Sequence, residues 1–130
     1  MAGVVPQLGM IVRYGFAFEP EDKDSNNKTR PAMILFAHKS GLTLVVPITH
    51  SEPKEGQDTL EIPDNLKEQL DLDEDKQWIH FNAANLFTWM GYDLVPSDTY
   101  PIAPRPFYEA VARRYLEIAN AGRVTKINRD

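Results

Sequence analysis

The fold is decided by the stretch "KTRPAMILFAHKSGLTLVVPITH", residues 28–50. Two apolar runs of strand length, 31–36 and 42–49, lie on either side of a short polar segment. Ser40–Gly41 in that segment can form the tight turn of an antiparallel hairpin. Pro47 has no backbone N–H, so it predicts that the second run is an edge strand or contains a bulge near its end.

Further strands and two helices are predicted on both sides of this hairpin. Runs rich in β-branched and aromatic residues predict strands at 9–18, 58–62, 77–81 and 85–90. Apolar residues at helical spacing, with a proline in the first turn, predict a short helix over 63–70 and a final helix from Pro106 to Gly122. About five or six short strands and these helices make a small α+β domain with a β-barrel-like sheet, spanning residues 1–130.

Composition limits the kinds of function. The 14 basic and 19 acidic residues give a net charge of −5, which argues against a general nucleic-acid coat protein but leaves room for a local RNA site. Without cysteine, disulfides, thiol nucleophiles and zinc–thiolate sites are excluded. No apolar stretch is long enough to span a membrane and the N-terminus lacks a basic leader, so we expect a cytoplasmic protein.

No cofactor and no metal are predicted. The three histidines are widely spaced, and the acidic segment 71–76 lacks the glycine and terminal glutamate of an EF-hand loop. Glycine-rich phosphate loops are also missing from the sequence. Residues 19–29, in contrast, contain six charged residues and no large apolar side chain, which predicts a mobile loop. A loop of this length inside a compact domain is often functional.

The order of motifs in the first half resembles the MazF/PemK-like toxin family. Gly9 opens the first strand, the charged loop follows, "RPAMIL" begins at Arg30, and "VPIT" ends at Thr49. The later segment "IPDNLKEQLDLDEDKQWI" is similar to a divergent PemK-like growth-inhibitor branch of type II toxin–antitoxin systems. The resemblance covers most of the chain. It implies an SH3-like barrel of antiparallel strands, a homodimer, and a toxin for plasmid maintenance that is inhibited by a separate antitoxin protein.

The resemblance also implies metal-independent cleavage of single-stranded RNA. By position, Arg30 matches the active-site arginine of the family, and Thr49 matches its threonine or serine. Some members place an arginine and an aspartate two residues apart on a later strand, where this chain has His80 and Asn82. Asn82 cannot act as a general base, so the resemblance does not supply a complete catalytic scheme.

RNA cleavage without a metal needs a base, a cation for the phosphate and an acid for the leaving oxygen. We assign the cation to Arg30, because an arginine stays charged and pairs bidentately with phosphate oxygens. Thr49 can donate a hydrogen bond to the same phosphate. His50 and His80 can transfer a proton near neutral pH. Since side chains alternate along a strand, however, Thr49 and His50 are expected to point apart.

Substrate binding is predicted for Lys28, Trp78 and Asn82. Trp78, His80 and Asn82 share one face of the expected strand, where an aromatic ring can stack on an RNA base. The same residues also fit structural roles: Arg30 can pair with the acidic loop, Thr49 can end a strand, and the tryptophan face can form a dimer surface. Two other functions therefore remain open, a catalytically inactive SH3-like binding module and a CcdB-like gyrase-directed toxin.

Overall fold

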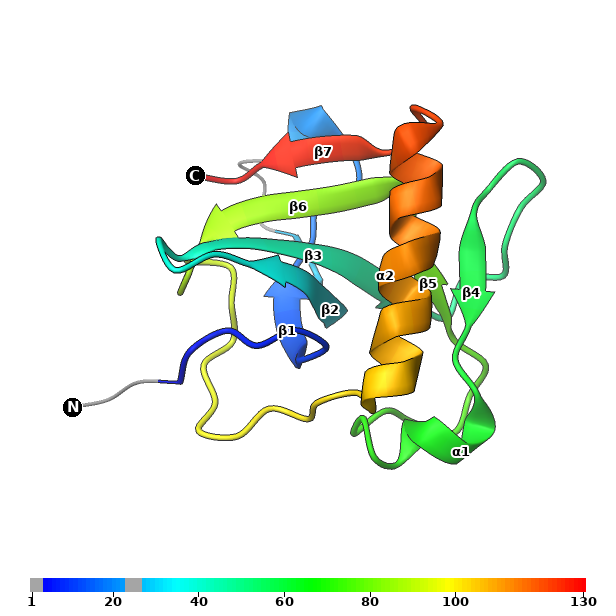
Figure 1. Ribbon diagram of the computed structural model, residues 1–130, viewed down its shortest axis with the longest axis horizontal. Helices are drawn as coiled ribbons and strands as arrows, with labels where there is room; N and C mark the ends of the chain where they lie inside the picture. Colours follow the sequence, from blue (N-terminus) through cyan, green and yellow to red (C-terminus); the bar gives the residue numbers. More distant parts are fainter. Residues whose placement is uncertain (1–3, 23–26) are drawn as a thin grey trace.

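The computed structural model describes residues 4–22 and 27–130, and within them one sheet of seven strands carries a long helix on one side (Figure 1). In chain order the elements are β1 (Ile11–Gly15), a 3-10 turn (Pro20–Asp22), β2 (Thr29–Ala37), β3 (Leu42–Thr49), β4 (Thr59–Glu61), α1 (Asp64–Lys67), β5 (Trp78–His80), β6 (Ala83–Thr88), α2 (Arg105–Asn120) and β7 (Thr125–Asn128). The fold is therefore a small α+β architecture, as the sequence predicts.

The sheet branches at β3. Leu42–Val45 of β3 pair with β6, whereas Ile48 and Thr49 pair with β5, and the other side of β3 pairs with β2. These pairs are antiparallel, and β7 joins the outer edge of β6 in parallel. Strand order runs β1-β2-β3-β5-β4, with β6 and β7 on the second branch, so the pairing among the described strands does not close the sheet into a barrel.

The hairpin of β2 and β3 forms where the sequence predicts it. Gly41 has a φ of 99°, which only glycine adopts readily, and His38 and Leu42 are bonded across the turn through an N–O distance of 2.8 Å. The prediction that Pro47 marks an edge strand or a bulge near the end of the second run is wrong, because β3 has partners on both sides and the register shift of the hairpin lies in β2, between Ile34 and Phe36. Pro47 instead lies between the residues that pair with β6 and those that pair with β5, where its missing N–H breaks no ladder on that side.

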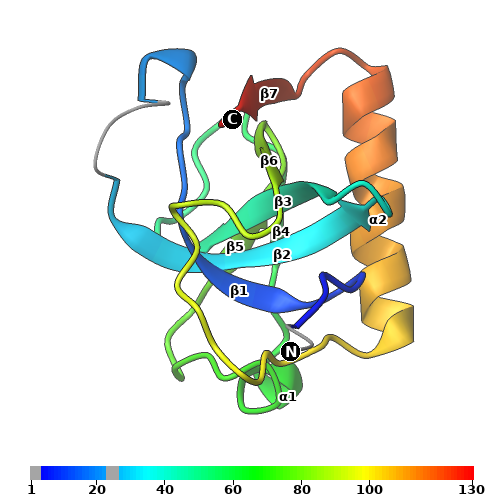
Figure 2. The ribbon, with the colours of Figure 1, turned by 90° about the vertical axis from the view of Figure 1, so that its left-hand side faces the viewer.

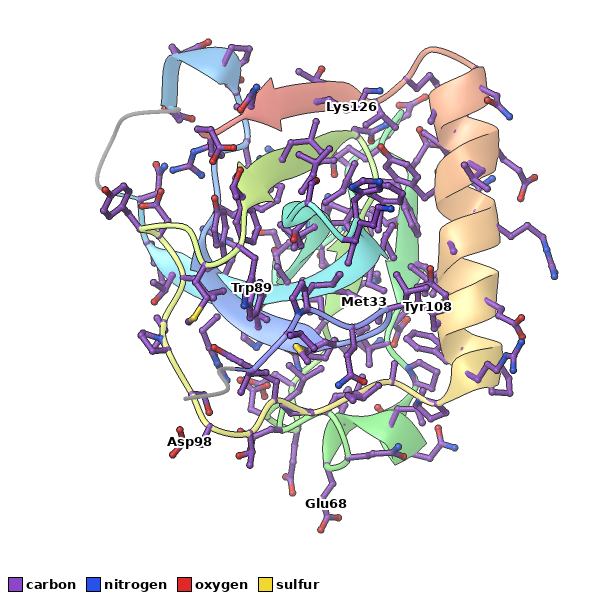
Figure 3. The ribbon with its side chains drawn as sticks, turned by 60° about the vertical axis from the view of Figure 1, so that its left-hand side comes forward. Met33, Glu68, Trp89, Asp98, Tyr108 and Lys126 are labelled. Carbon is purple, nitrogen blue, oxygen red and sulfur yellow. The ribbon has the colours of Figure 1, made fainter. Side chains whose placement is uncertain are left out.

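Apolar side chains are buried on both sides of the sheet. Between the sheet and α2, the core is formed by residues that include Met33, Val46, Ile79, Val111 and Ile118. Figure 3 shows Tyr108 on the side of α2 that faces the sheet, near Met33, and the Tyr108 hydroxyl donates to the Leu35 carbonyl at 2.9 Å. The segment between β6 and α2 passes along the opposite side of the sheet (Figure 2). It helps to cover the second core, which includes Met10, Val12, Tyr14, Ile34 and Phe87.

Several boundaries differ from the predictions. The first strand and the short helix are shorter than expected, because Gly9 and Phe18 lie outside β1 and the helix ends at Lys67. The final helix ends at Asn120, before Gly122 with a φ of 74°, as predicted. Strand β7 was not predicted. Part of the loop 19–29 that was expected to be mobile, residues 23–26, lies outside the described residues.

Within the ranges that the structure describes, no helix combines the length and the apolar character needed to cross a bilayer.

Candidate functional site

Strand pairing brings three of the candidate site residues into one row. Arg30 lies opposite Tyr14 of β1, and continuing the register Ala32–Pro47 by two residues places Thr49 opposite Arg30. Thr49 is paired in turn with Trp78 of β5. Because directly opposite residues share a face of the sheet, Arg30, Thr49 and Trp78 lie on one face, and His80 follows two residues later on the same face.

Arg30 is half-buried at the start of β2. Its guanidinium carbon lies 4.9 Å from the centre of the Phe18 ring, a cation–π contact. Burial lowers the pKa of Arg30, but an arginine remains charged at any physiological pH. Its Nε atom is buried and has no hydrogen-bond partner. The guanidinium that stacks on Phe18 therefore carries one buried N–H, at Nε, with no acceptor among the described residues.

His80 has a similar unpartnered atom. Its Nε2 is buried and makes no hydrogen bond. Burial holds the pKa of His80 below its usual 6.5, and the positive charge of Arg30 lowers it further, whereas a hydrogen bond to the Ser51 backbone opposes both effects. A bond that favours the protonated ring is one in which the ring donates to the carbonyl. In the neutral ring the proton is therefore assigned to Nδ1, and Nε2 carries a free lone pair.

Arg30 Nε and His80 Nε2 are the buried side-chain nitrogen or oxygen atoms that lack a hydrogen-bond partner in residues 4–22 and 27–130. Buried polar atoms are nearly always satisfied in folded proteins, so unsatisfied ones call for an explanation. Both atoms belong to side chains on the same face of the sheet, and the positive charge of Arg30 contributes to the lowered pKa of His80. The pair offers a fixed cation and a neutral base, which suits an anion that carries a nearby hydroxyl.

Thr49 supports this arrangement through the backbone. Its side chain is only 5% exposed, and its hydroxyl oxygen accepts a hydrogen bond from the Ser51 N–H at 2.8 Å. This bond turns the chain directly after β3 and fixes the Ser51 backbone, which bonds to His80. Thr49 is thus close to the expected site, although its observed bond is to the turn.

The structure places His50 away from this face. His50 is exposed, and its Nε2 lies 2.9 Å and 3.0 Å from the two carboxylate oxygens of Asp73. This bond lowers the pKa of Asp73. Ligand atoms of His50, Asp73 and Asp75 lie within 4.8 Å of one another, a spacing that a metal ion needs. All three side chains are exposed and the His50–Asp73 bond already explains their proximity, so the absence of a metal site stays a prediction.

The three predicted substrate-binding residues have different surroundings. Trp78 is 8% exposed, so its ring is packed in the core and presents no open face for stacking. Asn82 lies in the bend between β5 and β6, where its amide donates to Asp58 at 2.8 Å and to the Arg123 carbonyl at 3.0 Å. Lys28 is exposed, immediately before β2. Of these three, the structure brings only Trp78 into the row that contains Arg30.

Two contributors to the site were missed by the sequence analysis. Phe18 was assigned to the first strand without a role, although an aromatic residue next to a charged loop is a signal for a stacking partner. Ser51 acts through its backbone, which no residue type reveals. Phe18 follows the end of β1 and Ser51 follows the end of β3, and these are the two strands that flank β2, which carries Arg30.

No protein-family model matches this chain. A search of curated proteins also found no significant match.

Proposed function

We propose that this chain is a metal-independent endoribonuclease that cleaves single-stranded RNA at the Arg30–His80 pair. The observation that carries the proposal is the pair of buried, unpartnered atoms, Arg30 Nε and His80 Nε2, on one face of the sheet. Because both atoms are covered in the free protein, the proposal requires the side chains over them to move when RNA binds. A phosphodiester next to a ribose 2′-hydroxyl then gives each atom a partner, because the phosphate accepts from the arginine and the hydroxyl donates to the imidazole.

The proposed reaction uses these two side chains alone. His80 Nε2 takes the proton of the 2′-hydroxyl while the 2′-oxygen attacks the adjacent phosphorus. The bond between phosphorus and the 5′-oxygen breaks, and the departing oxygen takes a proton from solvent. Arg30 stabilises the charge that accumulates on the phosphate oxygens in the transition state. The products are a 2′,3′-cyclic phosphate and a 5′-hydroxyl, and His80 returns its proton to solvent.

The order of the motifs in the sequence supports a toxin of the MazF/PemK-like kind as the setting for this activity. In that setting the sheet is an open relative of the SH3-like barrel, the active protein is a cytoplasmic homodimer, and a separate antitoxin protein inhibits it. The half-buried Arg30 provides local positive charge in a chain whose net charge is −5. Growth inhibition then follows from cleavage of messenger RNA.

The test is cleavage of a long single-stranded RNA by the purified protein in EDTA. We expect cleavage by the wild type, a cyclic phosphate at the new 3′ end, and loss of cleavage in Arg30→Ala. Arg13→Ala is the matched control, because Arg13 is an exposed arginine of the neighbouring strand β1 with one long hydrogen bond of 3.5 Å to Asp71. Retained cleavage in Arg30→Ala, or equal loss in Arg13→Ala, contradicts the assignment.

A catalytically inactive binding module is the second candidate. The position that carries a catalytic aspartate in some related toxins is Asn82 here, and its amide is bonded to Asp58 and Arg123. The RNA experiment separates the two candidates. Intact RNA with a folded wild-type protein, free of any antitoxin, favours the binding module.

A further inference from the structure

The backbone that leaves β1 is held by a side chain instead of a strand. β1 ends at Gly15, and two residues later the Ala17 N–H donates to Asn85 Oδ1 at 2.8 Å. Asn85 Nδ2 donates back to the Ala17 carbonyl, also at 2.8 Å. Asn85 lies in β6 and is fully buried. The Asn85 amide therefore bonds both backbone groups of Ala17, as a neighbouring strand would, and fixes the backbone two residues beyond the end of β1.

Arg129 fixes the orientation of that amide. Its Nη1 donates to Asn85 Oδ1 at 2.8 Å and to the Gly15 carbonyl at 2.7 Å, and its Nη2 donates to Asp93 at 2.8 Å. The side chain is only 1% exposed, although Arg129 is the penultimate residue of the chain. Since Asn85 Oδ1 accepts from two N–H donors, a flipped amide would face both with its own N–H groups. The C-terminal segment thus determines how Asn85 holds Ala17.

The segment that is held carries the aromatic ring that covers Arg30. Phe18 directly follows Ala17, its ring contacts the Phe16 ring edge-on at 5.0 Å, and Arg30 lies over it at 4.9 Å. A cation–π contact orients a guanidinium only if the ring is itself held in place. In this chain, Phe16 packs in the core at 2% exposed and Asn85 bonds the residue between the two rings. The residues Arg129, Asn85, Ala17 and Phe18 form a continuous path to Arg30.

We infer that Asn85 and Phe18 are positioning residues, which hold the Arg30 guanidinium in the orientation that binds phosphate. The inference rests on the proposed function for its biological meaning, but it makes a statement about Arg30 that is measurable without RNA cleavage. Asn85 acts through Ala17 and Phe18, and touches neither the anion nor Arg30.

The experiment compares Phe18→Leu and Asn85→Asp with the wild type in two measurements. The first is the solvent-exchange rate of the Arg30 Nε–H proton, observed by NMR. The second is the affinity for inorganic phosphate, measured by titration. Leucine keeps the apolar volume of Phe18 and removes the aromatic face, and aspartate keeps the shape of Asn85 and removes the donor to the Ala17 carbonyl. We expect faster exchange in both variants and phosphate binding weaker by about two- to five-fold, the usual worth of one cation–π contact.

The matched control is Phe36→Leu. Phe36 is 46% exposed and stacks on His38 near the turn of the hairpin, so the same substitution there removes a ring that has no contact with the path to Arg30. We expect unchanged exchange and unchanged phosphate affinity in this variant. If Phe18→Leu also leaves both quantities unchanged, the inference is wrong, whether or not Asn85→Asp folds.

The double variant separates positioning from general stability. If Asn85 acts through Phe18, adding Asn85→Asp to Phe18→Leu produces no further loss of phosphate affinity, even though it lowers the melting temperature. Additive losses of affinity overturn the proposed path. Failure of the wild type to cleave RNA contradicts the proposed function alone, because the exchange rate of the Arg30 proton still decides the inference.

Discussion

Arg123 forms a two-pronged ion pair with Asp58, with Nε 3.0 Å from Oδ2 and Nη2 3.1 Å from Oδ1. Asp58 also accepts from Asn82, and Arg114 of α2 approaches to 3.7 Å. Asp58 precedes β4, whereas Arg123 lies between α2 and β7. One carboxylate therefore connects the start of β4 with the bend between β5 and β6, with α2 through Arg114, and with the α2–β7 connection through Arg123.

Replacing Asp58 with asparagine should destabilise the fold. The variant keeps the shape of the side chain but loses the charge that the Arg123 fork and Arg114 face, and a bidentate pair of this kind is stronger than a neutral hydrogen bond. We expect the melting temperature at pH 7 to fall by about 5 °C. Glu61→Gln is the matched control, because Glu61 is an exposed carboxylate of β4, and its melting temperature should stay within about 1 °C of the wild type.

The effect of Asp58 should also depend on pH. Bonds from Arg123 and Asn82 lower the pKa of Asp58 below 3.8 in the folded protein. A lowered carboxyl pKa contributes stability above the unfolded-state value, and this contribution disappears as the pH falls through the folded-state value. The difference in melting temperature between the wild type and Asp58→Asn should therefore shrink below pH 3.8. A constant difference down to pH 2 would show that the charge of Asp58 is not what stabilises the fold.

RNA cleavage should require the neutral form of His80. Burial and the charge of Arg30 hold the pKa of His80 below 6.5, so its base form dominates at pH 7. We expect log(kcat/KM) to rise with a slope of one at acid pH and to level off at a midpoint below 6.5. Arg30→Gln should raise the NMR titration midpoint of His80, because it removes a positive charge. A midpoint unchanged by Arg30→Gln means that the two side chains do not interact.

Replacing His50 should leave cleavage intact, in contrast to His80. His50 and Asp73 are 53% and 55% exposed, and exposed ion pairs contribute little to stability. We expect His50→Ala to keep the wild-type cleavage rate and melting temperature, while His80→Asn loses cleavage and stays folded. The two variants are compared on one RNA at one pH. Loss of cleavage in His50→Ala would assign the proton-transfer role to His50 instead of His80.

The parts of the fold that depend on neighbouring residues were predictable. The hairpin was recognised because its turn and both strands lie within residues 28–50, and the final helix because Pro106 and Gly122 mark its ends. Strand β7 was missed, because only Ile127 of its four residues is buried and its partner β6 lies far away in the sequence. A short, exposed strand shows neither alternation nor a continuous apolar run.

The candidate site was predictable only in part, for the same reason. Arg30 and Thr49 are two ends of one hairpin, so their proximity follows from its register. His80 shares their face of the sheet because β3 pairs with β5, and no pattern in the neighbouring sequence predicts this pairing. His50 and Asn82 found partners 23 and 24 residues away, at Asp73 and Asp58. Ion pairs and amide bonds over such distances leave no periodic signal in a sequence.

Pro47 should be replaceable even though it lies in the central strand. The Ile34 N–H donates to the Met10 carbonyl at 2.9 Å, and the Ile34 carbonyl accepts from the Gly9 N–H at 2.8 Å, so the backbone polar groups of Ile34 point to the side of β2 on which β1 lies. Because these groups alternate sides along a strand, those of Ala32 point to the same side. Pro47 is the partner of Ala32, so its nitrogen points away from β2, into the gap between β5 and β6.

A proline at that position removes no ladder hydrogen bond, whereas a proline at Val46 would remove one to β2. We expect Pro47→Val to change the free energy of unfolding by about 1 kcal/mol or less, mainly through the greater entropy of the unfolded chain. Val46→Pro should cost about 3 kcal/mol or more, because it deletes a bond between two central strands. Urea unfolding of both variants measures the difference. Equal losses would mean that the Pro47 nitrogen faces β2 and that the branching of the sheet at β3 does not explain why a proline is tolerated there.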